Sequence, residues 1–213
     1  MGTSPAGWVS KVLPEQPGVA RATQLASNLV EIERNEQPSL LIGVTSVQLV
    51  SYAVIEPFIE SNRHPAFVVN IPKEAVWTGE AIEALKANSI AFGGMGDLHR
   101  AIREDDPREY VFKEYAYVER RLRQHRNVKE IGRLYDRVWR VHRRSGSTLD
   151  VAISNEYDLT ADEVRTAYDR YSPFDILFHT NTMGRITEEA DAAAQELDIE
   201  LVTSGGLFDR LSR

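Results

Sequence analysis

The sequence predicts an α/β protein whose mostly parallel sheet with covering helices is interrupted by a basic helical insert. Short apolar runs alternate with helical patterns near both ends of the chain, which is typical of parallel sheets covered by helices. The middle of the chain shows only helical spacing and has a strong excess of positive charge. The predicted organisation is an arm over 1–20, an α/β domain over 21–104 with 173–213, and an insert over 105–172.

The first twenty residues are expected to form a flexible arm, because Pro14 and Pro17 disfavour regular structure. A helix is predicted over 22–33, where apolar residues recur at helical spacing. The residues that define its apolar face are Leu25, Leu29 and Ile32. The α/β domain is therefore expected to begin with a helix.

Strands and helices alternate on both sides of the insert. Before it, strands are predicted over 38–44, 65–71 and 89–95, and helices over 46–62 and 78–88. After it, the prediction is a strand over 174–180, a helix over 187–198 and a strand over 199–204. Pro57 should kink or shorten the helix that contains it.

The last part of the chain repeats an earlier part. Residues 67–102 align without a gap on 176–211, at a constant offset of 109 and with seven identities in 36 positions. Chance composition would give roughly two identities. Any two strand–helix–strand units share such a pattern, so a duplicated unit and two unrelated units of one type both fit the alignment.

The predicted insert is basic. Helical spacing runs through four of its segments, 110–125, 128–144, 149–157 and 160–171. Residues 111–145 hold 11 Lys and Arg against four Asp and Glu, a net of +7, so the rest of this −7 chain carries −14. A charge distribution this uneven predicts one surface for a polyanion or an acidic partner.

Residues that would carry chemistry are scarce. Cysteine is absent, which excludes disulfides, thiolate nucleophiles and cysteine-ligated metals and favours a cytoplasmic location. The five histidines include no pair at the spacing of a helical metal site, and neither a nucleotide-binding glycine motif nor a G-x-S-x-G elbow occurs. We therefore predict no catalytic residue, no metal ligand and no cofactor. No apolar run reaches 18 residues, so no membrane span is expected.

The segment ISNEYDLTADEV, residues 153–164, resembles the centre of a helix-turn-helix DNA-binding motif. The family pattern Ile-Ala-x-x-Tyr-Gly-Leu-Ser/Thr-x-x-x-Val is matched at Ile153, Tyr157, Leu159, Thr160 and Val164. Ser154 replaces Ala and is nearly as small, and Asp158 replaces Gly but tolerates a left-handed turn. The resemblance, over 150–171, implies that a helix beginning at Thr160 enters the major groove.

The charge near this motif is unfavourable for DNA. Residues 146–170 hold six acids against two arginines, a net of −4, and phosphates repel such a surface. Phosphate contacts are therefore expected from the preceding Arg-rich segments, where arginines share a helical stripe. The predicted DNA-binding residues are Arg120, Arg123, Arg133, Arg137, Arg140, Arg144, Thr160, Arg165 and Thr166. The alternative is a solvated face whose arginines pair with the chain's own carboxylates.

The C-terminal segment 174–211 resembles the end of restriction-endonuclease-like domains of the Mrr kind. There a strand leads through a loop into a helix and a short last strand, and the resemblance covers under a fifth of this chain. That family holds Mg²⁺ with an Asp followed by an E-x-K on adjoining strands. No such arrangement falls on the predicted strands, so the resemblance implies the fold without its chemistry.

Three functions follow from these patterns. We predict a DNA-binding protein that regulates transcription, forms a homodimer and contacts duplex phosphates through Arg-rich helices. One alternative is a restriction-endonuclease-like nuclease or a catalytically degenerate relative. The other is a non-enzymatic adaptor whose Arg-rich helices dock an acidic protein.

Overall fold

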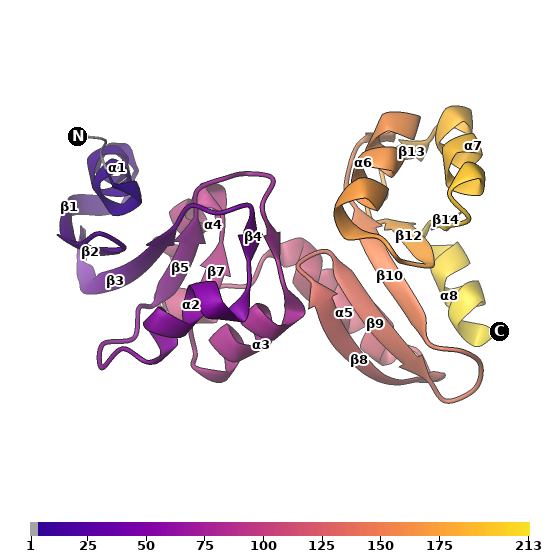
Figure 1. Ribbon diagram of the computed structural model, residues 1–213, viewed down its shortest axis with the longest axis horizontal. Coiled ribbons are helices and arrows are strands. Elements are labelled where there is room, and N and C mark those ends of the chain that lie inside the picture. Colours follow the sequence, from indigo (N-terminus) through magenta and orange to yellow (C-terminus); the bar gives the residue numbers. More distant parts are fainter. Residues whose placement is uncertain (1–3) are drawn as a thin grey trace. The chain divides into compact units, whose positions relative to one another are not determined.

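The computed structural model describes residues 4–213 and divides into two compact units (Figure 1). Unit 1 is Met1–Phe112 and unit 2 is Lys113–Arg213. The predicted domain that joins 21–104 to 173–213 is therefore wrong, because these segments belong to different units. The physical reason is that residues of the predicted insert form strands, and these strands pair with the C-terminal ones.

Unit 1 begins with a docked helix instead of an arm. Helix α1 spans Pro5–Val12 and continues into a 3-10 turn, Leu13–Glu15. The Ser4 hydroxyl caps α1 by accepting a hydrogen bond from the backbone N of Gly7 at 3.1 Å, and Pro5 suits the first turn. Ala6 and Val9 are fully buried in the core. The predicted arm is wrong for these residues, and its first three residues lie outside the described part of the chain.

A five-stranded mixed sheet forms the centre of unit 1, in the order β1-β2-β3-β5-β7. Its strands are β1 (Val19–Ala26), β2 (Leu29–Arg34), β3 (Gln37–Thr45), β5 (Phe67–Asn70) and β7 (Ala91–Gly93). The first three are antiparallel, whereas β3, β5 and β7 are parallel. The remaining elements are β4 (Leu49–Val50), α2 (Tyr52–Ile59), β6 (Val76–Trp77), α3 (Gly79–Ala87), α4 (Met95–Ala101) and a 3-10 turn, Pro107–Glu109.

Helices cover both faces of this sheet. Phe67 and Val69 pack with residues of α1 and α4, while Val68 between them packs with α2 and α3. Because side chains alternate along a strand, one short apolar run supplies both cores. Short parallel strands β4 and β6 pair at the edge where β3 and β5 end.

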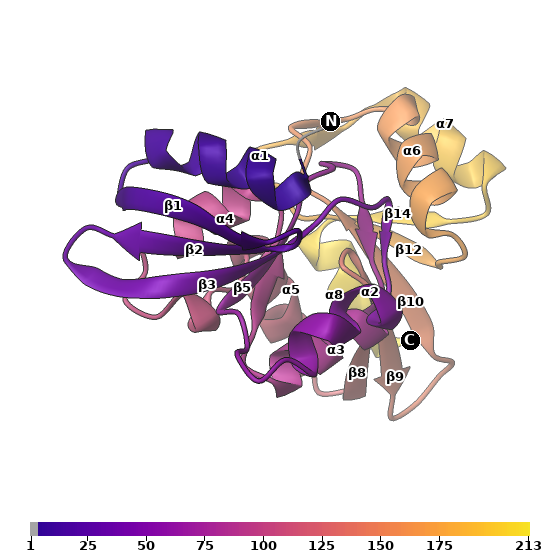
Figure 2. The ribbon, with the colours of Figure 1, turned by 60° about the vertical axis from the view of Figure 1, so that its left-hand side comes forward.

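Unit 2 repeats this arrangement with the sheet order β8-β9-β10-β12-β14. Its sheet strands are β8 (Val128–Tyr135), β9 (Val138–Arg143), β10 (Leu149–Ser154), β12 (Ile176–His179) and β14 (Glu200–Val202). The other elements are α5 (Lys113–Gln124), β11 (Asp158–Leu159), α6 (Ala161–Tyr171), β13 (Arg185–Ile186), α7 (Glu188–Glu196) and α8 (Ser204–Ser212). Helices α5 and α8 share a core with Val151, Ile153 and Phe178. Helices α6 and α7 pack against each other (Figure 2).

The two units coincide element by element at the offset of 109. Strand β5 begins at 67 and β12 at 176, β4 at 49 and β11 at 158, and α3 at 79 and α7 at 188. Even the backbone detail repeats, because Ser89 and Asp198 at matched positions both have a positive φ, 53° and 55°. The repeat predicted over 36 positions therefore extends through both units, which favours a duplicated unit over two unrelated ones.

Several predicted elements need correction. The sheets are mixed instead of mostly parallel, with two antiparallel and two parallel pairings each. The helices predicted over 22–33 and 128–144 are the β1–β2 and β8–β9 hairpins. The helix-turn-helix is wrong as well, because its first half ends strand β10, although its second half is helix α6. Among the described residues, no helix has the length and apolar character to cross a membrane.

Candidate nucleic-acid interface and polar cluster of unit 2

Two of the arginines predicted to contact DNA lie in the β8–β9 hairpin and form ion pairs with carboxylates of α5. Arg133 on β8 has a side chain that is 2% exposed and forms an ion pair with Glu119 of α5. Arg137, in the turn between β8 and β9, donates from Nη2 to Glu114 Oε2 at 3.0 Å. These two side chains therefore cannot form the outward stripe that the sequence predicted.

Two further arginines are engaged at the surface of unit 2. Arg140 on β9 clasps Asp150 of β10, with Nε–Oδ1 and Nη2–Oδ2 distances of 2.9 and 2.7 Å. Arg165 on α6 reaches Glu196 of α7 at 3.4 Å. The alternative of pairing with the chain's own carboxylates is thus correct for these two residues and for the preceding pair.

The two predicted threonines lie on or beside α6. Thr160 is the N-cap of α6, where its Oγ1 accepts a hydrogen bond from the backbone N of Glu163 at 3.4 Å. Thr166 is exposed on the same helix. Because α6 does not follow a first helix, these residues are not placed as a recognition helix would place them.

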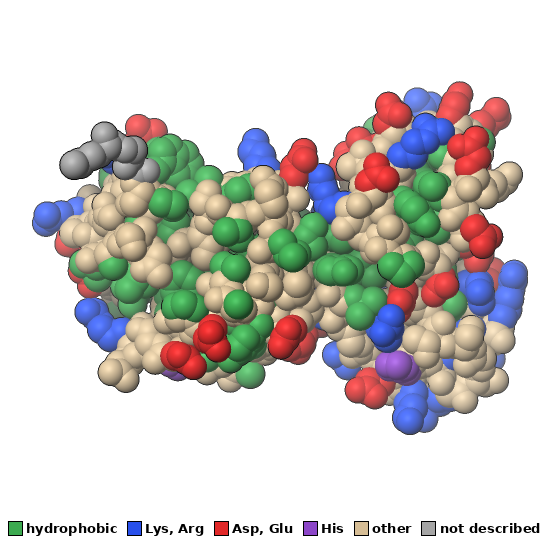
Figure 3. Space-filling view, in the orientation of Figure 1, with side chains coloured by type: hydrophobic (Ala, Val, Ile, Leu, Met, Phe, Trp, Pro, Cys, Tyr) green, Lys and Arg blue, Asp and Glu red, His purple; other side chains and the backbone are tan. Residues whose placement is uncertain are grey.

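The other predicted arginines belong to a cationic surface at one end of unit 2. We call this surface the basic end; it comprises Arg120, Arg123, Arg126, Lys129 and Arg144, all exposed. They come from α5, the turn after it, the start of β8 and the residue after β9. Asn127 links the turn after α5 to the end of β9, because its backbone O accepts from Arg144 N at 2.7 Å and its Nδ2 donates to Ser145 O at 2.9 Å. Figure 3 shows Lys and Arg side chains gathered over the hairpin side of unit 2.

The cations of the basic end have no carboxylate partner among residues 4–213. The negative end of the α5 dipole stabilises those in its last turn, which is the ordinary structural reason for such charges. That reason does not extend to Lys129 and Arg144, which lie outside the helix. At the matched positions unit 1 has Lys11, Pro14, Pro17, Ala20 and Asn35. The fold therefore does not require five cations there.

A polar cluster lies where β10 and β12 end, an edge at which parallel sheets commonly bind ligands. Glu114 is buried and accepts from Thr180 Oγ1 at 2.7 Å as well as from Arg137. Asp136 is also buried and accepts from the hydroxyls of Tyr115 at 3.4 Å and Tyr171 at 3.3 Å. Sequence patterns missed this cluster, because its members are far apart in the chain.

The same cluster continues beneath α5 around Arg133. Its guanidinium lies over the rings of Trp139 and Tyr115, at 4.0 and 4.8 Å, and donates from Nη1 to the Asp136 carbonyl at 2.7 Å. Trp139 Nε1 donates to Glu119 Oε1 at 3.3 Å. Cation–π contacts and paired charge together offset the desolvation of a buried guanidinium.

Electrostatics hold this cluster in one protonation state. Burial raises the pKa of the Tyr115 and Tyr171 hydroxyls, and the Asp136 carboxylate raises both further. Burial is the largest single influence on the pKa of Arg137 and lowers it, but Glu114, Tyr115, Tyr171 and Asp136 together outweigh burial, and the net shift is upward. The two tyrosines therefore stay protonated hydrogen-bond donors, and the Arg137 guanidinium stays charged.

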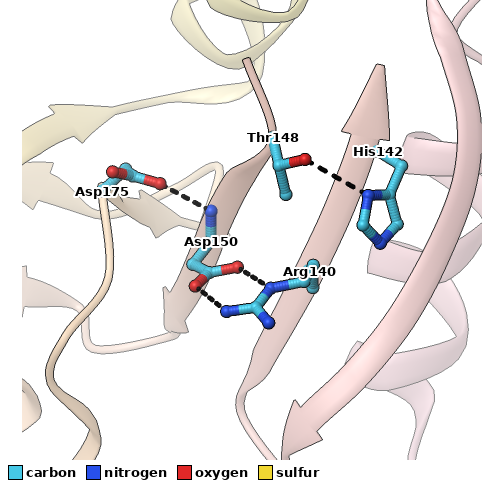
Figure 4. Close-up of a pocket in the computed structure, with 5 residues that line it drawn as sticks. All are labelled: Arg140, His142, Thr148, Asp150 and Asp175. Atoms are coloured by element: carbon cyan, nitrogen blue, oxygen red, sulfur yellow. Dashed lines mark hydrogen bonds and ion pairs between the residues drawn. The ribbon is translucent and has the colours of Figure 1, made fainter. Parts of the chain in front are cut away.

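A shallow hollow of about 360 Å³ lies on the outer side of β9 and β10 (Figure 4). It is lined by Arg140, His142, Thr148, Asp150 and Asp175. Asp150 is held by Arg140, and its backbone N donates to Asp175 Oδ2 at 2.7 Å, while His142 Nδ1 lies 3.2 Å from Thr148 Oγ1. These partners satisfy the lining groups among themselves, and the hollow offers no nucleophile–base–orienter arrangement.

The carboxylates that the nuclease alternative needs are not brought together. Among residues 4–213 no three His, Asp or Glu side chains form a group that could hold a metal ion. The sequence contains no Lys two residues after an Asp or Glu, and β10, with the sequence LDVAIS, has neither Glu nor Lys. An Asp with an E-x-K on adjoining strands is therefore not available in either unit.

Comparisons with known proteins add no relative. No family model matches this chain, and neither curated proteins nor solved structures give a match.

Proposed function

We propose that this protein binds duplex DNA through the basic end of unit 2 and does not cleave it. One observation supports the proposal: five exposed cations lie on neighbouring segments at this end of unit 2, and none has a carboxylate partner among the described residues. Unit 1 builds the same fold with one cation at the matched positions. Charge that the fold does not need and the molecule does not neutralise is available to a polyanion.

The binding energy would come from counterion release. Each phosphate neutralised by Lys or Arg makes the slope of log K against log salt steeper by about 0.9 for duplex DNA. Five contacts give a slope of about −4.5, which is a loss of about 500-fold in affinity between 50 and 200 mM salt. Such contacts fix position on the duplex and carry little sequence information. The proposal is therefore binding with weak sequence preference, and regulation of transcription stays a prediction.

The restriction-endonuclease-like alternative is supported only as a fold without chemistry. Each unit ends with the strand, loop, helix and short strand of that resemblance, followed by a last helix. The acidic residues for Mg²⁺ are missing, as described above. Plasmid DNA incubated with Mg²⁺ or Mn²⁺ should stay intact, and metal-dependent cutting would overturn the non-cleaving part of the proposal.

The deciding experiment is a salt series of fluorescence anisotropy titrations with a labelled duplex. In the variant Arg120→Gln/Arg123→Gln/Arg126→Gln the slope should become shallower by about 2.7, since three phosphate contacts are lost. The matched control is Arg21→Gln/Arg63→Gln/Arg103→Gln, which removes three exposed cations from unit 1. The control should keep the slope of the parent protein. Equal slopes for the two variants would overturn the proposal.

A further inference from the structure

Two neighbouring loops of unit 2 present a small apolar tip. We define the tip as Tyr157, in the loop after β10, and Met183, in the loop after β12. The two residues are 66% and 80% exposed, the highest values among the large apolar residues in the described chain. Single exposed apolar residues are ordinary, but these two lie on loops that are hydrogen-bonded to each other.

The tip is rigidly built. The Tyr157 carbonyl accepts from the backbone N of Arg185 at 2.9 Å, and Asn181 Oδ1 accepts from the backbone N of Met183 at 3.1 Å. Asp158 and Arg185 are paired both in the β11–β13 ladder and through a 2.8 Å ion pair. A Cβ on Gly184 would overlap the Tyr157 carbonyl oxygen, so the loops touch. A preorganised surface loses little conformational entropy when it binds.

Unit 1 shows that the fold does not need an apolar tip. The matched positions hold Gln48 and Glu74, both polar. The same loops, with the same β4–β6 ladder, therefore form with hydrophilic residues at these two places. Tyr and Met are enriched in the cores of protein–protein interfaces, where charged residues are depleted. The exposed pair in unit 2 thus indicates a docking contact.

The surroundings of the tip are acidic. The loops and the first turns of α6 and α7 carry Glu156, Asp158, Asp162, Glu163, Glu188 and Glu189. The cations nearby are Arg185 and Arg165, and each has carboxylate partners. Acids in first turns also complement the helix dipoles, but the resulting surface repels phosphates and fits a basic protein surface. Figure 3 shows Asp and Glu side chains over α6 and α7.

We propose that the tip of one molecule docks on the basic end of a second copy of this chain. The two surfaces lie at opposite ends of β10, so they cannot meet within one unit and the contact must run head to tail. At the basic end, guanidinium groups would form cation–π contacts with the Tyr157 ring. The half-buried rings of His125 and Phe208 would contact the Met183 sulfur. Because the tip and the basic end are different surfaces, the contact is heterologous, and copies joined by it either close into a ring or continue as an open row.

This inference shares one surface with the proposed function, because DNA and the tip of a second copy would compete for the basic end. Sedimentation velocity of the full chain at low salt should show species that grow beyond a dimer as concentration rises. The tip variant Tyr157→Gln/Met183→Gln removes the ring and the sulfur without adding charge, and it should weaken association by about tenfold or more. The variant Arg123→Glu/Arg126→Glu reverses charge at the basic end and should weaken association to a similar extent.

Mixing the two variants gives the decisive result. One keeps an intact basic end and the other an intact tip, so the mixture should form a 1:1 dimer and nothing larger. Parent protein that stays monomeric at low salt, or a mixture that associates no differently from either variant alone, would overturn the docking proposal. DNA binding is measured separately: the tip variant should retain the parent salt slope. If the parent protein binds DNA but does not associate, only the docking proposal is overturned. If it associates but does not bind DNA, only the proposed function is overturned.

Discussion

The two units of this chain have one fold and differ in what they place on it. Strand order, helix positions and even the positive φ at Ser89 and Asp198 coincide at an offset of 109. The polar cluster, the basic end and the apolar tip occur only in unit 2. Unit 1 therefore serves as an internal control for which residues the fold requires.

A charged pair of unit 2 that unit 1 replaces with neutral residues shows what this comparison reveals. Buried Arg133 forms an ion pair with half-buried Glu119, and the matched residues of unit 1 are Gln24 and Ser10. Buried ion pairs are weak evidence for stability, because desolvation offsets much of the Coulomb attraction. Groups that the fold can replace with small neutral residues are candidates for another role.

The largest expected effect comes from breaking this ion pair on one side. Glu119→Gln should lower the free energy of unfolding of unit 2 by about 3–5 kcal/mol, because Arg133 is left buried without its countercharge. Urea unfolding followed by tryptophan fluorescence reports on unit 2 when Trp8 and Trp77 of unit 1 are replaced by Phe in all variants, because Trp139 is then the sole tryptophan. The double variant Glu119→Ser/Arg133→Gln, with the unit 1 residues, should recover at least half of that loss. No recovery would mean that unit 2 depends on the pair and that the comparison misleads.

A smaller effect is expected where the loops touch. Gly184→Ala should cost about 1–3 kcal/mol, because the added Cβ meets the Tyr157 carbonyl oxygen and the His179 ring. The matched residue of unit 1 is already Ala75, in a turn with the same hydrogen bond to the residue three before it. Thermal unfolding of Gly184→Ala beside Ala75→Gly, which should cost less than about 1 kcal/mol, tests the difference. Equal effects would show that the loops of unit 2 are no tighter than those of unit 1.

The elements after each hairpin could be predicted from sequence, and the hairpins could not. The runs around β5, α3, β12 and α7 carry clear periods and Thr caps at Thr78 and Thr187. In β8 the register shifts between Val128 and Glu130 and between Arg133 and Tyr135, and these irregularities interrupt the alternation of apolar residues. Val128, Ile131, Val138 and Val141 then fall at three-, seven- and three-residue steps, which imitate a helix.

The candidate site was predicted in part for a related reason. Charge counting located the excess of arginine, but it could not separate the cations that α5 and β10 neutralise from those left outside. Glu114 and Thr180 meet only because the sheet brings distant segments together. Aligning the whole chain at the offset of 109 would have matched Glu114 with Pro5 and Thr180 with Ile71, which marks both polar residues as specific to unit 2.

The next prediction concerns the dependence of the unfolding free energy of unit 2 on alkaline pH. The folded state holds the Tyr171 hydroxyl protonated above its ordinary pKa near 10, so its contribution to stability is complete below pH 10 and is lost as pH rises further. In Tyr171→Phe the fall of the unfolding free energy above pH 10 should be less steep by up to about 1.4 kcal/mol per pH unit. Denaturant unfolding between pH 9 and pH 11 measures this slope. The exposed control Tyr157→Phe should match the parent protein, and an unchanged slope in Tyr171→Phe would contradict the prediction.

The smallest effect concerns a hydrogen bond that both units make with different residues. His179 Nε2 lies 2.7 Å from the Glu156 carbonyl oxygen, and at the matched place Asn70 Nδ2 donates to the Val47 carbonyl at 3.0 Å. His179→Ala should cost about 1 kcal/mol, because the loop after β10 loses its tie. His179→Asn places the unit 1 residue there and should cost less than half as much. Hydrogen exchange of the Glu156 and Tyr157 amides follows the loop directly. If Asn protects these amides no better than Ala, the two units hold their loops by different means.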